Sequence, residues 1–276
     1  MRRTTFGTGL SGLVWEGGGR MPVVLVHGLA SNALLWEGVA DRLSEEGHPV
    51  VAVDLRGHGA SWEVAGPFDF GTMAADLCQV IGRAFGRPVL VAGQSWGGNV
   101  ALETGVRHPE SVGGVVCVDG GFITPSAGFA TWEEALEALT PPRFEGVTVE
   151  QLRERVAIRR PGWPERTADR VLGNFRTLAD GTVTARLALE HHLTILRQLW
   201  DHRPLEAVRR LGVPLLVLAV GEDDPARRER VETFIGVAPD AELVWCEGDH
   251  DLHLQQPQMV AERILGFSQG RWRTAP

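Results

Sequence analysis

A single serine stands between glycines where an apolar run ends. Residues 93–98 read Gly-Gln-Ser-Trp-Gly-Gly and follow Leu90-Val91-Ala92. Serine and glycine are poor strand residues, so a buried strand should end here, and the next residues, 99–102, indicate a helix. A sharp turn from strand to helix would present the Ser95 hydroxyl at the top of a sheet. The stretch therefore predicts a nucleophilic serine, with a plain structural turn as the alternative.

A serine hydroxyl is a weak nucleophile, so Ser95 needs a histidine as general base and an acid that orients this histidine. For a serine in such a turn, the chain order is serine, acid, histidine, each in a loop after its own strand. His250 lies just after the last strand-like run, 243–245. We expect His250 to be the base and His253 to pack inside the fold. The alternative for His250 is a solvated loop histidine.

Three aspartates follow strand-like runs and could orient His250. Asp223 and Asp224 come after one run, and Asp119 comes after the run that precedes it. We prefer Asp224, because a short turn after Gly221 would bring this position back toward the histidine loop. Asp119 and Asp223 stay open as alternatives.

Attack on a carbonyl also needs donors for the oxyanion, typically two backbone N–H groups. We expect one from Trp96, the residue after the serine. The other should come from Leu29, in the loop His27-Gly28-Leu29 after the first parallel strand. His27 itself is predicted to orient this loop and to take no part in the chemistry.

Short apolar runs that alternate with helical patterns must position these residues. The runs are continuous, as in parallel strands that helices cover on both faces, and they predict a doubly wound α/β sheet. An antiparallel hairpin is expected at one edge, before Val23. The expected strands lie at 23–26, 50–53, 89–92, 115–118, 215–218 and 243–245, and the expected helices near 32–46, 69–85, 97–107, 226–236 and 256–267.

The alternation stops once, between residues 122 and 205. This stretch has no strand-like run and is too long for a loop, so we expect a helical insertion in a core of residues 1–121 and 206–276. Two capping boxes, a proline suited to a first helical position and a leucine repeat indicate four helices. These signals lie at Thr131, Thr148, Pro164 and Leu189. The insertion should cover the carboxyl ends of the strands, where open α/β sheets bind ligands.

The composition fits a globular protein with a large core: 276 residues, 43% hydrophobic and 22% charged. A net charge of −8 argues against nucleic-acid and anionic-membrane partners and leaves a small-molecule substrate. The three cysteines are an odd number in apolar contexts, so we expect buried free thiols. The start of the chain has no apolar stretch, so we expect a cytoplasmic protein. No cofactor or metal is expected, because the triplets 190–192 and 249–251 lack metal-ligand spacing.

Taken together, these motifs resemble the α/β-hydrolase family over essentially the whole chain. Residues 93–97 resemble its nucleophile elbow and His27-Gly28 its oxyanion loop. Residues 54–61, Asp-Leu-Arg-Gly-His-Gly-Ala-Ser, are similar to its Asp-x-Arg-Gly-x-Gly-x-Ser turn. Asp224 and His250 match the family's acid and base.

The resemblance also implies an eight-stranded, mostly parallel sheet with residues 122–205 as a variable helical cap. Asp119 corresponds to an alternative acid position that some dehalogenases use. The turn at residues 54–61 is mainly structural in the family.

The implied activity is a serine hydrolase of the carboxylesterase kind, which forms an acyl-enzyme on Ser95. The expected substrate is a small-to-medium apolar ester, thioester or lactone. Carbon–carbon bond hydrolases and perhydrolases use the same triad and stay as alternatives, as does a non-catalytic binding protein. Haloalkane dehalogenases need an aspartate where this chain has serine. The candidate pocket residues of the insertion are Phe122, Phe129, Trp132, Phe144, Trp163, Phe175, Trp200 and His192.

Overall fold

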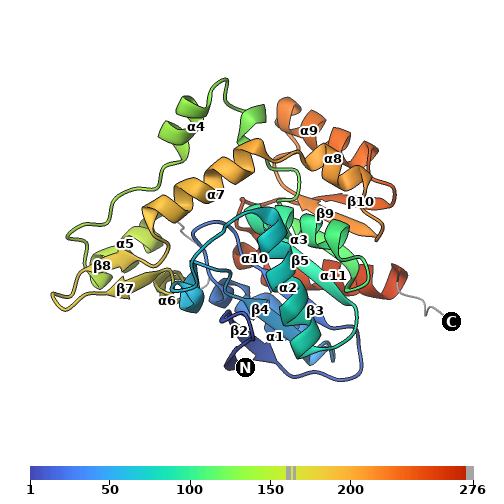
Figure 1. Ribbon diagram of the computed structural model, residues 1–276, viewed down its shortest axis with the longest axis horizontal. Helices are drawn as coiled ribbons and strands as arrows, with labels where there is room; N and C mark the ends of the chain where they lie inside the picture. Colours follow the sequence, from blue (N-terminus) through green and yellow to red (C-terminus); the bar gives the residue numbers. More distant parts are fainter. Residues whose placement is uncertain (160–162, 164–165, 272–276) are drawn as a thin grey trace.

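A sheet of eight strands forms the centre of the computed structural model, which describes residues 1–159, 163 and 166–271 (Figure 1). The strand order is β1-β2-β4-β3-β5-β6-β9-β10. All strands from β4 to β10 in this order are parallel, while β1 and β2 form the expected antiparallel hairpin at one edge. The strands are β1 (Arg2–Thr5), β2 (Ser11–Trp15), β3 (Val23–Val26), β4 (Val50–Val53), β5 (Val89–Gln94), β6 (Val112–Val118), β9 (Leu215–Ala219) and β10 (Ala241–Trp245). The predicted doubly wound, eight-stranded sheet is confirmed.

Two hydrophobic cores cover the two faces of this sheet. Successive strand side chains point to opposite faces, so in β3 Val24 and Val26 join one core, while Val23 and Leu25 join the other. The first core is shared with α2 (Phe70–Ala84), α3 (Trp96–Arg107), α8 (Pro204–Arg209) and α9 (Pro225–Gly236). The second is shared with α1 (Glu37–Glu45) and α11 (Pro257–Arg271). Burial on both faces is the physical reason for continuous apolar strands.

The segment between β6 and β9 leaves the sheet and lies above it and to its left in Figure 1. It contains α4 (Trp132–Leu139), α5 (Val149–Arg159), α6 (Thr167–Leu172) and α7 (Leu189–Asp201). The predicted capping box at Thr148 forms, since Thr148 and Gln151 cap each other. At Thr131 the box is only half formed: Thr131 Oγ1 accepts from the amide of Glu134 at 3.2 Å, but the Glu134 carboxylate accepts from the amide of Ala130. Pro164, the third expected helix start, lies outside the described residues.

The expectation that this segment is wholly helical is wrong. Strands β7 (Phe175–Thr177) and β8 (Val183–Ala185) form a separate antiparallel hairpin. Its turn contains Asp180-Gly181, with Gly181 at φ +82°, a backbone conformation that favours glycine. An Asp-Gly pair between short strands is a hairpin signal, but three-residue strands are too short to show a periodicity of two.

The two ends of the inserted segment meet at one side chain of α3. Asn99 Nδ2 donates to the carbonyl of Ile123 at 2.8 Å and lies 3.0 Å from Nδ1 of His202. His202 Nε2 in turn lies 2.9 Å from Glu103 on the same helix. The predicted border between residues 205 and 206 falls inside α8, which packs against α3. By packing, α8 therefore belongs with the sheet.

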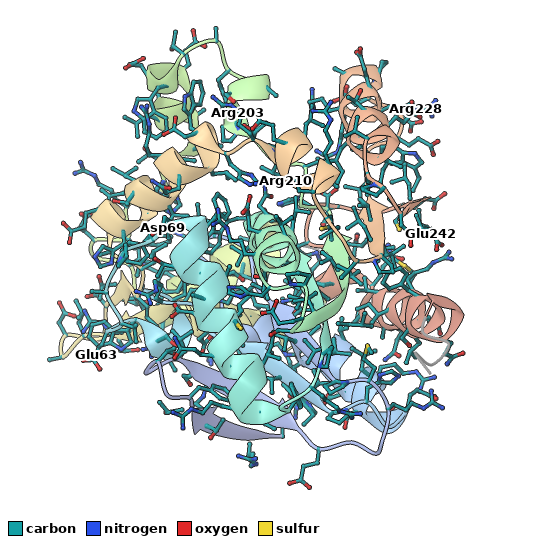
Figure 2. The ribbon with its side chains drawn as sticks, turned by 45° about the vertical axis from the view of Figure 1, so that its right-hand side comes forward. Glu63, Asp69, Arg203, Arg210, Arg228 and Glu242 are labelled. Carbon is teal, nitrogen blue, oxygen red and sulfur yellow. The ribbon has the colours of Figure 1, made fainter. Side chains whose placement is uncertain are left out.

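Many charged side chains lie at the periphery, as Glu63, Arg228 and Glu242 do in Figure 2, but a few acidic ones, among them Asp54 and Asp119, are buried. All three cysteines are free thiols, but only Cys117 is fully buried, whereas Cys78 and Cys246 are half-buried. Within the described residues, no helix has the length and apolar character needed to cross a membrane.

Candidate active site

Ser95 occupies the tight connection between β5 and α3. Its backbone has φ +54° and ψ −128°, a strained conformation for a residue with a Cβ. The glycines around it allow the close approach that this turn requires: a Cβ on Gly98 would lie 2.7 Å from the amide nitrogen of Gly121. Ser95 precedes the first residue of α3, so its hydroxyl lies at the positive end of a helix.

His250 connects Ser95 to an aspartate. Its Nε2 lies 2.8 Å from the Ser95 hydroxyl, and its Nδ1 lies 2.5 Å from Oδ2 of Asp119. A carboxylate can only accept, so Nδ1 carries the proton and Nε2 is free to accept from the serine. These contacts bring together the carboxyl ends of β5 and β6 and the loop after β10.

The preference for Asp224 as the partner of His250 is wrong, and Asp119, the alternative, makes this contact. Oδ1 of Asp224 accepts from the amides of Ala226 and Arg227 at 3.0 and 3.2 Å, so its carboxylate caps α9. An aspartate before a proline at the first helical position is the usual sequence for a helix start, and Asp224-Pro225 fits it. Asp223, the remaining alternative, is exposed.

Asp119 is completely buried and accepts from three donors. Besides His250, these are the amide of Val220 at 3.2 Å and Nη2 of Arg227 at 2.6 Å. Arg227 also donates from Nε to the carbonyl of Val220 at 2.7 Å, which fixes the guanidinium in place. The Asp119 backbone has φ +45°, another strained conformation. Sequence reasoning missed Arg227, because a charged residue in the first turn of a surface helix has no distinguishing pattern.

The charges of this group shift its pKa values in opposite directions. Burial raises the pKa of Asp119, but the hydrogen bond and charge of His250 and the charge of Arg227 outweigh it, so this pKa is lowered. Burial lowers the pKa of His250, but the hydrogen bond and charge of Asp119 outweigh it, so that pKa is raised above 6.5. Asp119 therefore stays ionised while His250 holds a proton more tightly than a free imidazole.

Two buried histidines hold the loop that faces Ser95. His27 accepts at Nε2 from the amide of Leu55 at 3.0 Å, and its Nδ1 bonds to the carbonyl of Gly28 at 2.7 Å. His58 accepts at Nε2 from the amide of Ala30 at 3.2 Å. Burial lowers the pKa of each imidazole, most strongly for His58, so both are neutral. His27 thus orients the loop, as its position in the sequence indicates.

The loop reaches the serine because Gly28 has no side chain. A Cβ there would lie 2.5 Å from Oε1 of Gln94 and 3.2 Å from Cβ of Ser95. The amide of Trp96, the first residue of α3, belongs to the N–H groups that have no partner inside a helix. Leu29 and Trp96 both line the cavity that contains Ser95. Both residues that are predicted to supply oxyanion donors thus border the same cavity as Ser95.

Gln94, His253 and the turn at residues 54–61 support the site without reaching the reacting atoms. Gln94 Nε2 donates to the carbonyl of His250 at 2.9 Å, which ties the histidine loop to β5. His253 is buried against Trp36, and burial lowers its pKa to about 3, so it packs as a neutral ring. Asp54 accepts from the amides of Ala33 and Ala60 and from Arg3, which supports a structural role for this turn.

A cavity of about 660 Å³ contains Ser95, Asp119 and His250. Its other walls are mainly aliphatic and come partly from the inserted segment: Ile123, Pro125, Leu139, Leu196 and Leu199. A second cavity of about 700 Å³ lies beside it, and His192 lines both.

The candidate aromatic residues have other surroundings. Phe144 and Phe175 line the second cavity, with their rings 4.8 Å apart in an edge-to-face contact. Trp132 and Trp200 pack against each other. Among the described residues, none of the seven aromatic candidates lines the Ser95 cavity.

The profile of the alpha/beta hydrolase family matches residues 23–263. The chain belongs to the alpha/beta hydrolase family. A protein of Mycobacterium phage D29 named as a non-heme haloperoxidase is 32% identical over 263 residues, which cover 88% of this chain and 86% of that protein. An esterase of Mycobacterium tuberculosis is 36% identical over 119 residues, but these span only 38% of its length and 43% of this chain.

The fold of this alpha/beta hydrolase is also found in solved structures. The crystal structure of E-2-(acetamidomethylene)succinate hydrolase has a TM-score of 0.75 and 22% identity, over 98% of each chain. This likeness extends to the region of the inserted segment and supports the fold alone.

Proposed function

We propose that this protein is a serine hydrolase that cleaves small-to-medium apolar esters, thioesters or lactones through an acyl-enzyme on Ser95. The observation that carries the proposal is the position of His250, 2.8 Å from the Ser95 hydroxyl and 2.5 Å from the buried Asp119. A nucleophile within hydrogen-bond reach of a base, which a third group orients, is the arrangement that acyl transfer requires.

The proposed reaction has two halves. Ser95 Oγ attacks the carbonyl carbon while His250 Nε2 takes the hydroxyl proton, and the amides of Leu29 and Trp96 donate to the oxyanion. The carbon–oxygen or carbon–sulfur bond then breaks, and His250 gives its proton to the leaving group. A water molecule attacks the acyl-enzyme in the same way and releases the acid. Asp119, not Asp224, is the proposed acid, and it stabilises the imidazolium that forms in each half.

The substrate class follows from the walls of the cavity. Aliphatic residues of the inserted segment, including Leu139 and Leu196, line the cavity that contains Ser95 and favour an apolar acyl or alcohol group. We propose that residues 122–205 act as a cap whose side chains select the substrate. Three free thiols are consistent with the cytoplasm as the compartment.

A fluorophosphonate probe and a panel of p-nitrophenyl esters of graded acyl length test the proposal. We expect covalent labelling of Ser95 and turnover of esters with short to medium chains. A folded protein whose Ser95 stays unlabelled would contradict the nucleophile. Labelling without turnover of any ester would favour carbon–carbon bond hydrolysis or perhydrolysis on the same triad.

The pH dependence of kcat/KM should report the pKa of His250. Only neutral His250 can accept the Ser95 proton, so activity falls as the pH decreases through this pKa. Because Asp119 raises the pKa of His250, we expect the half-maximal point of the acid limb above pH 6.5. A midpoint below 6.5, measured with an ester whose own ionisation lies elsewhere, would contradict this assignment.

Arg227 is proposed as a positioning residue for Asp119. Arg227→Met removes the 2.6 Å contact, and we expect kcat/KM to fall about 10- to 100-fold through the loss of alignment. Arg227 also lowers the pKa of His250, so the acid limb should move to higher pH. Arg227→Lys, the control, keeps the charge and should keep the pH midpoint while recovering part of kcat. An unchanged rate and midpoint in Arg227→Met would contradict this role.

A further inference from the structure

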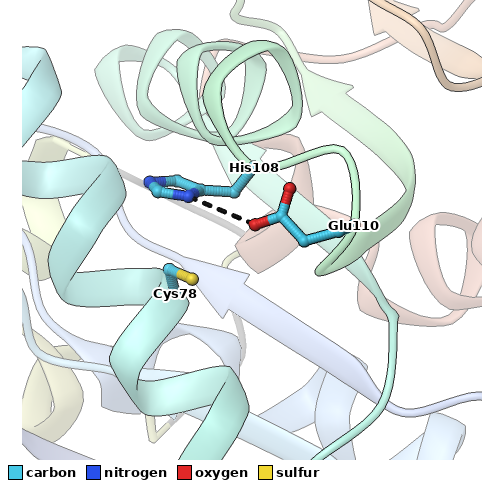
Figure 3. Close-up of side chains that lie close together, drawn as sticks. All are labelled: Cys78, His108 and Glu110. Carbon is cyan, nitrogen blue, oxygen red and sulfur yellow. Dashed lines mark ion pairs between the residues drawn. The ribbon is translucent and has the colours of Figure 1, made fainter.

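A second group of chemistry-bearing side chains lies near the amino end of β6, whereas Ser95 follows the carboxyl end of the neighbouring strand β5. Cys78, His108 and Glu110 each offer a ligand atom, and these atoms all lie within 4.8 Å of one another. Figure 3 shows Cys78 on α2 facing His108 and Glu110, which lie between α3 and β6. The mechanism proposed above uses none of the three.

We propose that Cys78, His108 and Glu110 form a binding site for a zinc-like divalent transition-metal ion. Thiolate, imidazole and carboxylate are the three side-chain ligand types of Zn²⁺, whereas Mg²⁺ and Ca²⁺ prefer oxygen alone. Three protein ligands leave the fourth tetrahedral position to water. Glu110 is exposed and the other two are half-buried, so an ion and its water have access from solvent.

The separation of the ligand atoms fits such an ion. Zn–N and Zn–O bonds of about 2.1 Å place tetrahedral ligand atoms about 3.4 Å apart. Nδ1 of His108 and Oε1 of Glu110 are already 3.5 Å apart. The sulfur of Cys78 lies within 4.8 Å of both atoms, so the thiol must approach this pair more closely when an ion binds. On binding, a bond forms between sulfur and the metal, the S–H bond breaks, and the proton passes to solvent.

The backbone holds the two other ligands in place before any ion binds. His108 directly follows α3, and its carbonyl accepts from the amides of Ser111 at 2.9 Å and Val112 at 3.1 Å. Pro109 between the two ligands restricts the chain further. Ser111 Oγ lies 3.4 Å from the sulfur of Cys78 and can donate to the thiolate. The nearest cation in the sequence, Arg107, is directed to Glu103 at 2.8 Å.

A bound ion would join α2 to the turn between α3 and β6. This turn leads into the amino end of β6, whereas Ser95 follows the carboxyl end of the neighbouring β5. The strand β5 has six residues and is about 20 Å long, and its length separates the two sites. The ion would therefore not touch the catalytic residues, and its effect would be on stability. This proposal is independent of the proposed hydrolase activity.

Titration of the apo protein with Co²⁺ and Zn²⁺ tests the site. Co²⁺ should produce a thiolate-to-cobalt charge-transfer band that saturates at one equivalent, and Zn²⁺ should abolish this band by displacement. Zn²⁺ at a hundredfold excess over its Kd should raise Tm by about 5 °C. No band at stoichiometric concentrations would overturn the proposal.

Matched variants separate this site from other metal binding. Cys78→Ser should remove the band, and His108→Gln and Glu110→Gln should weaken Co²⁺ binding at least about 10-fold. Cys246→Ser, which removes the other half-buried thiol, should keep the band. Loss of the band in Cys246→Ser, or its survival in Cys78→Ser, would show that the ion binds elsewhere. His108→Gln serves as an independent check if Cys78→Ser folds poorly.

Discussion

Ser95→Ala should lower kcat/KM for a p-nitrophenyl ester by at least about 10⁴-fold, because the acyl-enzyme can no longer form. The remaining rate would come from substrate binding and from the amides of Leu29 and Trp96. Steady-state kinetics with the preferred ester of the panel measure the effect, and unchanged unfolding shows that the fold is intact. Retention of more than about a hundredth of the activity would exclude Ser95 as the nucleophile.

A second substitution at the same position tests the strain of this turn. Ser95 adopts φ +54°, which glycine adopts without strain and a residue with a Cβ only with strain. Ser95→Gly should therefore be more stable than Ser95→Ala by about 1 kcal/mol, after the larger chain entropy of unfolded glycine is subtracted. Urea unfolding of the two inactive variants measures the difference. Equal stability would mean that the turn holds no strain.

Asp119→Asn should lower kcat/KM by about 10³- to 10⁴-fold. An amide can donate to Nδ1 of His250, which stabilises the wrong tautomer, and it cannot stabilise the imidazolium. The loss of negative charge also lowers the pKa of His250, so the acid limb of the pH profile should move to lower pH.

Asp224→Asn is the matched control, because asparagine caps helices as well as aspartate does. We expect its kcat/KM within about threefold of the wild type and little change in unfolding free energy. Both variants change one carboxylate to an amide beside the same cavity, so only the contact with His250 distinguishes them. A severe loss in Asp224→Asn with an active Asp119→Asn would restore Asp224 as the acid.

Local patterns sufficed for the fold and for two of the three residues in the proposed triad. Ser95 and His250 could be predicted because each follows an apolar run with the pattern of a strand, although β10 before His250 is only partly buried. The acid was harder, since Asp119 and Asp224 follow β6 and β9, which are neighbours in the sheet. Both loops start at the carboxyl ends of these strands, so only the direction of each side chain decides which aspartate reaches His250.

The information that decides between these aspartates was partly present in the sequence. Asp224-Pro225 is a helix-start signal, and an aspartate that caps a helix is engaged in that bond. The role of Arg227 and the approach of Cys78 to His108 could not be predicted. Arg227 contacts Asp119 across 108 positions of the chain, and Cys78 lies 30 positions before His108. No local periodicity in the sequence indicates contacts of this range.

The contacts of Asn99 with Ile123 and His202 have a consequence for how the inserted segment can vary in length and sequence. Because the carbonyl of Ile123 and the ring of His202 meet at one amide, the segment between them leaves and returns at a single point of the core. Such a segment behaves as an exchangeable cassette: its length and sequence can vary without a change in the strand order. That point lies four residues after Ser95, on α3, the helix that Ser95 precedes. A replacement of this segment at its two adjacent junctions should therefore change the walls of the cavity and leave Ser95, Asp119 and His250 in place.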